Sequence, residues 1–130
     1  MFGDKKKEPT EVYLANAKIN REILPKFTRA QLSSYNGVDK PQLYVGIKGD
    51  IFDVSGNIQS YGPSKPYNKF VGKDAARLLG MNKLQLKEED GDPTNTWDLS
   101  RLNEKQLKVV DEWVEFFKMR YPIVGTIEDK

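Results

Sequence analysis

The sequence contains neither histidine nor cysteine among its 130 residues. The absence of cysteine excludes disulfides, thiolate nucleophiles, zinc ribbons and iron–sulfur ligation, and it is compatible with a reducing compartment. The absence of histidine excludes Ser-His catalytic triads, the usual zinc sites and haem ligation by imidazole. The chain therefore lacks the two side chains that most often bind metals or act as nucleophiles.

Long apolar runs and strong net charge are missing as well. No run approaches the roughly 18 apolar residues of a membrane span, and the start, MFGDKKKEPT, lacks the apolar core of a signal peptide. The net charge of +2 is too small to indicate a nucleic-acid partner, and no basic stripe is interleaved with aromatic residues. Glycine-rich phosphate loops and G-x-S-x-G are also absent. We therefore do not expect an enzyme that acts through its own side chains alone.

The length favours one domain preceded by a short N-terminal region. Residues 1–9 are charged and are expected to be disordered. An amphipathic helix is predicted from Thr10 to the helix-ending Pro25, with its apolar face made by residues 12, 15, 19 and 23. This helix is expected either to dock on the domain as an arm or to bind a partner, and docking is the more common outcome for such a helix.

Short helices alternate with strands in the rest of the chain, which predicts an α+β fold. Thr28 and Gln31 have the spacing of a capping box, and Gly37 is expected to end that helix. A hairpin is predicted from residues 43–47 and 51–54. Residues 74–79 read as a helix stopped by Gly80, and residues 87–98 as a solvated acidic loop. The last helix is expected to begin at Asn103 and to bury a stripe of Leu107, Val110, Trp113, Val114, Phe117 and Tyr121, followed by an edge strand at 123–127.

Two tyrosines, Tyr61 and Tyr67, lie in the Gly- and Pro-containing segment SYGPSKPYNKFVGKDAARLLG. A tyrosine phenol has a pKa near ~10, so it binds a metal at neutral pH only if the metal displaces its proton. Ferric iron can do so, and tyrosinate is one of the recognised axial ligands of haem. A second tyrosine can supply the hydrogen bond that orients such a ligand. Loop tyrosines more often serve in ordinary packing, so composition leaves both interpretations open.

Several separated motifs resemble the membrane-associated progesterone receptor family, whose members are cytochrome b5-like haem/steroid-binding domains. The resemblance is carried by the segment FTRAQLSSYNGVDKPQLYVGIKGDIFDVSG, by the tyrosine segment above and by the ending DEWVEFFKMRYPIVGTI. It covers about residues 27–127. The resemblance implies a cytochrome b5-like α+β domain over these residues, in which a small sheet and several short helices frame a cleft, with residues 1–26 as an N-terminal tail and amphipathic helix.

The resemblance also implies a function and a site. It assigns Tyr67 as the axial ligand of haem b with five-coordinate ferric iron, and Tyr61 as the hydrogen-bond donor that supports it. It places Arg120 and Tyr121 beside the same side of the cleft, where a cation can pair with a haem propionate. The expected partner is a haem-thiolate monooxygenase of sterol synthesis, supported by haem handling, electron transfer or stabilisation. The expected location is intracellular, in the cytoplasm or peripheral to the endoplasmic reticulum membrane.

Other functions stay open from the sequence. A haem-free module that binds a sterol or another lipid, or that acts only through its surface, is the main alternative, and a homodimer is left open. Catalysis through bound haem is less favoured, because no distal histidine is available for acid/base chemistry. Phe70 and Leu78 are expected either to line an apolar haem edge or to fill the core.

Overall fold

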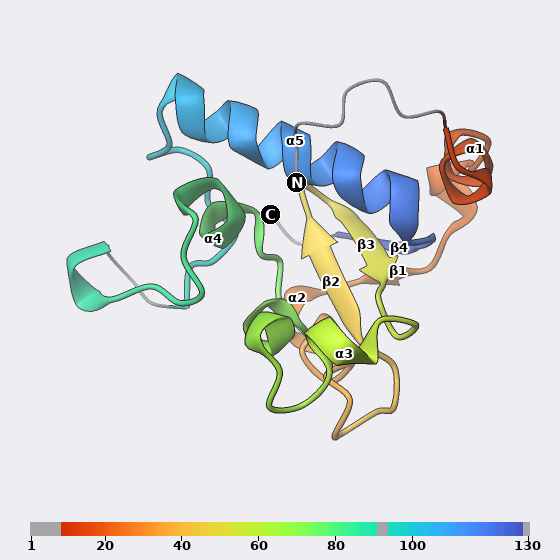
Figure 1. Ribbon diagram of the computed structural model, residues 1–130, viewed down its shortest axis with the longest axis horizontal. Coiled ribbons are helices and arrows are strands. Elements are labelled where there is room, and N and C mark those ends of the chain that lie inside the picture. Colours follow the sequence, from red (N-terminus) through yellow and green to blue (C-terminus); the bar gives the residue numbers. More distant parts are fainter. Residues whose placement is uncertain (1–8, 91–93, 129–130) are drawn as a thin grey trace.

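The computed structural model describes residues 9–90 and 94–128, which form a four-stranded sheet with one long helix and several short ones around it (Figure 1). This arrangement confirms the predicted α+β class. The elements in chain order are α1 (Glu11–Ala17), η1 (Arg21–Ile23), β1 (Lys26–Phe27), α2 (Arg29–Leu32), β2 (Tyr44–Ile47), β3 (Asp50–Asp53), α3 (Ile58–Tyr61), η2 (Pro66–Phe70), α4 (Ala76–Met81), η3 (Glu88–Asp90), α5 (Glu104–Arg120) and β4 (Ile123–Ile127).

The predicted hairpin is present as β2 and β3, which pair antiparallel with Tyr44 opposite Asp53. Lys48 and Gly49 form its two-residue turn with φ values of 51° and 91°. Positive φ at both positions gives the twist that joins two adjacent antiparallel strands. The side chains on one face of this hairpin enter the core, where Val45 and Phe52 are fully buried.

The prediction of an edge strand at 123–127 is wrong, because β4 lies inside the sheet. The strand order is β1-β4-β3-β2, with β4 antiparallel to β3 and parallel to β1. The two residues of β1 cover the outer edge of β4, and the amide of Thr126 donates to the carbonyl of Pro25 at 3.0 Å. Sequence patterning missed β1 because a two-residue strand has no measurable period.

Helix α5 begins as predicted, with Asn103 and Gln106 forming a reciprocal capping box. Its buried side chains Val110, Trp113 and Phe117 face the sheet and the short helices. Leu107 was expected in the same stripe but is 37% exposed, because it lies in the first turn, beyond the elements that cover the rest of the helix face.

Helix α4 differs from its prediction at both ends. It begins at Ala76 and continues through Gly80 to Met81, where Asn82 adopts the left-handed conformation that ends it. Gly80 does not stop the helix but lets α4 approach α5, since a Cβ there would lie 2.7 Å from Cγ2 of Val110. The capping box of Thr28 and Gln31 is confirmed, whereas Gly37, with φ of +84°, lies beyond the end of α2.

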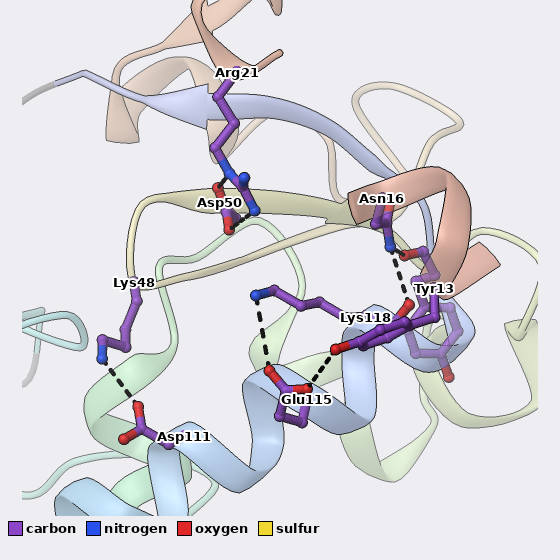
Figure 2. Close-up of polar contacts among 9 residues, drawn as sticks. Tyr13, Asn16, Arg21, Lys48, Asp50, Asp111, Glu115 and Lys118 are labelled. Carbon is purple, nitrogen blue, oxygen red and sulfur yellow. Dashed lines mark hydrogen bonds and ion pairs between the residues drawn. The ribbon is translucent and has the colours of Figure 1, made fainter. Parts of the chain in front are cut away.

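The N-terminal helix is shorter than predicted and packs through its polar side. Ile23, expected on the apolar face, is 80% exposed, and Ala15 is exposed as well. The arm nevertheless docks on the domain, as the more common of the two expected outcomes. Figure 2 shows Tyr13 and Asn16 of α1 directed at α5, where the Tyr13 hydroxyl donates to Glu115 at 3.2 Å. Disorder was predicted for residues 1–9, of which residues 1–8 lie outside the described residues and Pro9 is exposed.

The acidic segment is held against the domain where the structure describes it. The buried guanidinium of Arg77 donates to the backbone carbonyls of Asp90 and Asn95. Lys83 forms a 2.8 Å ion pair with the Asp90 carboxylate, whose side chain is only 10% exposed. The prediction of a wholly solvated acidic run is therefore wrong at Asp90, because two cations of the α4 region bind it.

Within residues 9–90 and 94–128, every helix falls short of the length or the continuous apolar character required to cross a membrane.

Replacing Asn103 by Ala removes the acceptor that caps α5, so we expect the free energy of unfolding to fall by about 1 kcal/mol. Asn103→Asp is the matched control, because its carboxylate can accept the same bond from the Gln106 amide and favours a helix N-terminus. Urea denaturation followed by circular dichroism measures both variants. Equal losses in the two variants would show that the cap contributes nothing.

Candidate functional site

A cleft of about 260 Å³ lies among α3, η2 and the C-terminal end of α5. It adjoins a second hollow of about 480 Å³ that shares Asn57, Arg120 and Tyr121 with it. The larger hollow falls in the volume range of small-molecule sites, about 300–1,000 Å³. All four residues that the sequence singled out line the first cleft, which is formed by Asn57, Ser60, Tyr61, Tyr67, Phe116, Arg120 and Tyr121.

Tyr61 forms the inner wall of this cleft and is 1% exposed. It is the last residue of α3, and its carbonyl accepts a 2.9 Å bond from the side-chain amide of Asn68, which fixes the loop that follows. Burial raises the pKa of the Tyr61 phenol far above its ordinary value, and the neighbouring Tyr121 and Tyr67 raise it further, against a smaller lowering by Arg120. The phenol is therefore protonated at neutral pH.

Tyr67 forms the accessible side of the same cleft and is half-buried. It lies in η2, which begins at Pro66, a residue whose fixed φ suits the first position of a helical turn. Its ring packs 5.7 Å from the ring of Tyr61 and 5.6 Å from that of Phe70, measured between centroids. The edge of Trp113 supports it from α5 at 6.5 Å. Aromatic contacts on several sides thus hold one accessible phenol beside an enclosed one.

Arg120 and Tyr121 enter the cleft from the end of α5. The Tyr121 hydroxyl accepts a 3.0 Å bond from the side-chain amide of Asn57, and the Tyr121 ring lies edge-on to that of Tyr61 at 5.9 Å between centroids. The guanidinium of the exposed Arg120 stacks on the ring of Phe116 at 4.6 Å, which holds the cation at the rim. The Tyr61 ring thus lies against the rings of both Tyr67 and Tyr121, and the expected hydrogen bond from Tyr61 to a Tyr67 phenolate stays a prediction.

Three lining residues were not predicted from the sequence. Asn57 precedes a four-residue helix and belongs to no motif. Ser60 and Phe116 lie within segments that carry the resemblance, but the resemblance assigned them no role, and Phe116 looks like part of an ordinary helical stripe. Of the two apolar residues with open roles, Leu78 is fully buried in the core, while Phe70 is buried but contacts the ring of Tyr67.

The donor set determines which kinds of cofactor fit this cleft. Within the described residues no group of three or more carboxylate, histidine or cysteine side chains is placed to hold a bare metal ion. The cleft offers phenol oxygens, one cation at the rim and an aromatic wall. A haem brings its own four nitrogen ligands and requires a single axial ligand from the protein, with cations for its propionates. These residues therefore fit a haem bound through one phenolate.

Comparison with known proteins defines the family of this chain. Residues 28–121 match the model of the cytochrome b5-like heme/steroid binding domain, so the chain belongs to that family. A solved structure from Arabidopsis thaliana, described as having a cytochrome b5 like fold, is 39% identical with a TM-score of 0.69 and covers 85% of this chain and 96% of its own. The predicted cytochrome b5-like fold is thus confirmed.

The relatives belong to the steroid-binding and progesterone-receptor branch of this family. The Arabidopsis thaliana protein named "Probable steroid-binding protein 3" is 42% identical over 78% of this chain and 97% of its own length. The Schizosaccharomyces pombe "Cytochrome P450 regulator dap1" is 34% identical over 78% of this chain and 61% of its own length. The human "Membrane-associated progesterone receptor component 2" is 36% identical over 78% of this chain, which spans 44% of that relative. The resemblance to the membrane-associated progesterone receptor family is therefore confirmed.

The raised pKa of Tyr61 links stability to pH with a defined sign. The folded state holds this proton more tightly than the unfolded chain, so its contribution is complete below the ordinary tyrosine pKa of about 10 and is lost as pH rises above it. Above about pH 10.5 we expect the free energy of unfolding to fall more steeply in the wild type than in Tyr61→Phe, by about 1.4 kcal/mol per pH unit. Urea denaturation at several pH values measures both slopes, and parallel slopes would contradict the enclosure of this phenol.

Proposed function

We propose that this domain binds haem b through the phenolate of Tyr67 and serves haem-thiolate monooxygenases of sterol metabolism. The observation that carries the proposal is the cleft itself, in which an accessible phenol lies against an enclosed one, with Arg120 at the rim. Its membership of the cytochrome b5-like heme/steroid-binding family supports the same conclusion.

The two phenols differ in what they can do. Tyr61 is 1% exposed and its pKa is strongly raised, so it neither reaches a planar cofactor nor gives up its proton readily. Tyr67 is half-buried with its ring in the cleft wall, where an incoming iron can displace its proton. Tyr67 is therefore the axial ligand in this proposal. Tyr61 and Tyr121 form the layer of phenols behind it, the arrangement from which a hydrogen bond orients a metal ligand.

The rim supplies the complementary charge. Arg120 is exposed, and its guanidinium is held on the Phe116 ring rather than in an ion pair with a carboxylate that the structure shows. A guanidinium forms strong charge-assisted bonds with carboxylates such as haem propionates. The apolar face of Phe116 beside it covers part of a flat aromatic ligand.

An anionic oxygen ligand also favours one kind of role. Haem held by a tyrosinate supplies a ferric centre of low potential, because the negative ligand stabilises the oxidised iron. Such a centre accepts an electron only with difficulty, so it is poorly suited to relay electrons to a monooxygenase. Haem handling or stabilisation of the partner is therefore the favoured role, and the relative named as a cytochrome P450 regulator supports a monooxygenase as that partner.

Haemin titration with visible spectroscopy tests the ligand. We expect the wild type to give a saturable high-spin ferric spectrum with a phenolate charge-transfer band, and Tyr67→Phe to lose that band. Tyr61→Phe is expected to keep the band but to bind about 10- to 100-fold more weakly, the usual cost of losing the hydrogen bond behind a metal ligand.

Tyr35→Phe is the matched control, because the half-buried Tyr35 ring lies outside the cleft lining and stacks on the Tyr44 ring at 4.7 Å between centroids. This variant is expected to bind haemin as the wild type does. A band that persists in Tyr67→Phe would overturn the ligand assignment. No haemin binding by the wild type would overturn the haem proposal as a whole.

The rim cation has its own test. Arg120→Gln is expected to weaken haemin binding about three- to tenfold and to make the affinity less dependent on salt, because one exposed charge pair is lost. Arg120→Lys keeps the charge and is expected to retain most of the affinity. Arg101→Gln, an exposed arginine outside the cleft lining, is the control for net charge. Equal effects of Arg120→Gln and Arg101→Gln would exclude a specific role for Arg120.

A haem-free steroid-binding module is the second candidate, and the name "Probable steroid-binding protein 3" of the Arabidopsis relative favours it. The aromatic lining of the cleft also suits a flat apolar ring system. The two candidates separate in one experiment with purified protein. Saturable binding of progesterone by a wild type that refuses haemin would establish the second candidate.

A further inference from the structure

Asn16 of helix α1 is a buried polar side chain, 3% exposed, that lies outside the cleft. Its amide nitrogen donates to the carbonyl of Lys118 at 3.0 Å and to the carbonyl of Tyr121 at 2.9 Å. Its amide oxygen accepts a 2.9 Å bond from the backbone N–H of Ile123. Figure 2 shows Asn16 directed from α1 toward the end of α5. One side chain thus binds three peptide groups of the turn that joins α5 to β4.

This turn needs an outside partner for its peptide groups. The last carbonyls of a helix have no partner inside the helix, and Pro122 brings no N–H to the turn. Tyr121 itself is extended, with φ of −129° and ψ of 140°, and its amide makes the last helical bond to Phe117 at 2.8 Å. Asn16 therefore replaces the hydrogen bonds that neither the helix nor the strand can provide.

The same turn carries Arg120 and Tyr121 into the cleft. Backbone movement there displaces the Tyr121 hydroxyl from its bond to Asn57 and the Tyr121 ring from its contact with the Tyr61 ring at 5.9 Å. The rest of the arm is held mostly by exposed polar contacts: the Thr10 hydroxyl donates to the carbonyl of Met119 at 2.6 Å, the Tyr13 hydroxyl donates to Glu115, and Arg21 forms a bidentate ion pair with Asp50. Ile19 and Leu24, which follow α1, are half-buried against the core.

We propose that Asn16 is a positioning residue for the cleft, so that docking of the N-terminal arm fixes Tyr121 and thereby sets ligand affinity. The proposal rests on the proposed haem function only in that haemin affinity is one of its two measurements. Its structural part concerns Tyr121 and Tyr61 and holds without any ligand. Release of the arm then lowers the affinity for the bound molecule without changing Tyr67, the proposed axial ligand. The arm is thereby a regulatory element of the site.

A double-mutant cycle in the full chain tests the coupling. Asn16→Ala and Tyr121→Phe are each expected to weaken haemin binding about three- to tenfold. The double variant is expected to be no more than about twofold weaker than the worse single variant, because both changes act through one group. The phenolate band is expected to remain in all three variants. Multiplying effects, or an unchanged affinity in Asn16→Ala, would overturn the proposal.

A second measurement uses the protein without haemin. Fluorotyrosine is incorporated, and the fluorine resonances are assigned with Tyr→Phe variants. We expect Asn16→Ala to shift or broaden the resonances of Tyr121 and Tyr61 and to leave that of Tyr44 unchanged. Tyr13→Phe is the matched control, because it removes a bond between the arm and α5 that does not reach the turn. Unchanged Tyr121 and Tyr61 resonances in Asn16→Ala would refute the positioning role.

The two measurements separate the failure of this inference from the failure of the proposed function. A wild type that refuses haemin overturns the haem proposal, and the fluorine spectra then decide the role of Asn16. If Asn16→Ala does not fold, Asn16→Asp replaces it in both measurements: it has the same size and keeps the acceptor for Ile123, but it loses both donors to the turn. The expected and contradicting outcomes are then the same.

Discussion

The packing of Phe117 is the contact on which both the core and the cleft depend. This ring is fully buried and lies 5.3 Å from the ring of Phe52 in β3 and 5.1 Å from that of Tyr121. It also meets Tyr61 at 6.2 Å. Because one ring joins the sheet, α5 and α3, the position of the helix on the sheet also sets the spacing of two cleft tyrosines. The site is therefore built from core residues rather than from a mobile loop laid on the surface.

The asymmetry of the cleft follows from this construction. Tyr61 ends a helix that packs on the core, so its phenol is enclosed and stays protonated. Tyr67 follows six residues later, after a loop in which Ser64 takes a φ of 71°, and its ring returns to the surface of the same cluster. Six residues thus separate an enclosed phenol from an accessible one, a difference that the identical side chains do not reveal.

The sequence predicted the fold class, the hairpin and the caps at Thr28 and Asn103, because each depends on residues close together in the chain. It also identified the four residues that the structure gathers in the cleft, although that identification came from resemblance and not from local chemistry. It failed for the position of β4 in the sheet and for the face through which the arm docks. The position of β4 depends on pairing with a two-residue strand, and the arm binds through Asn16, whose polar letter contradicts an apolar stripe.

Polar contact by the arm has a physical consequence that an apolar stripe does not have. An amphipathic helix held by burial tolerates small shifts along its partner, because apolar contact is not directional. Asn16 instead fixes three peptide groups at 2.9 to 3.0 Å, so the arm and the α5–β4 turn have one mutual register. Leaving those groups buried without partners is costly, so docking is favoured as a unit or lost as a unit. The short helix α1, which makes little apolar contact, is thereby suited to two states: docked next to the cleft or released from it.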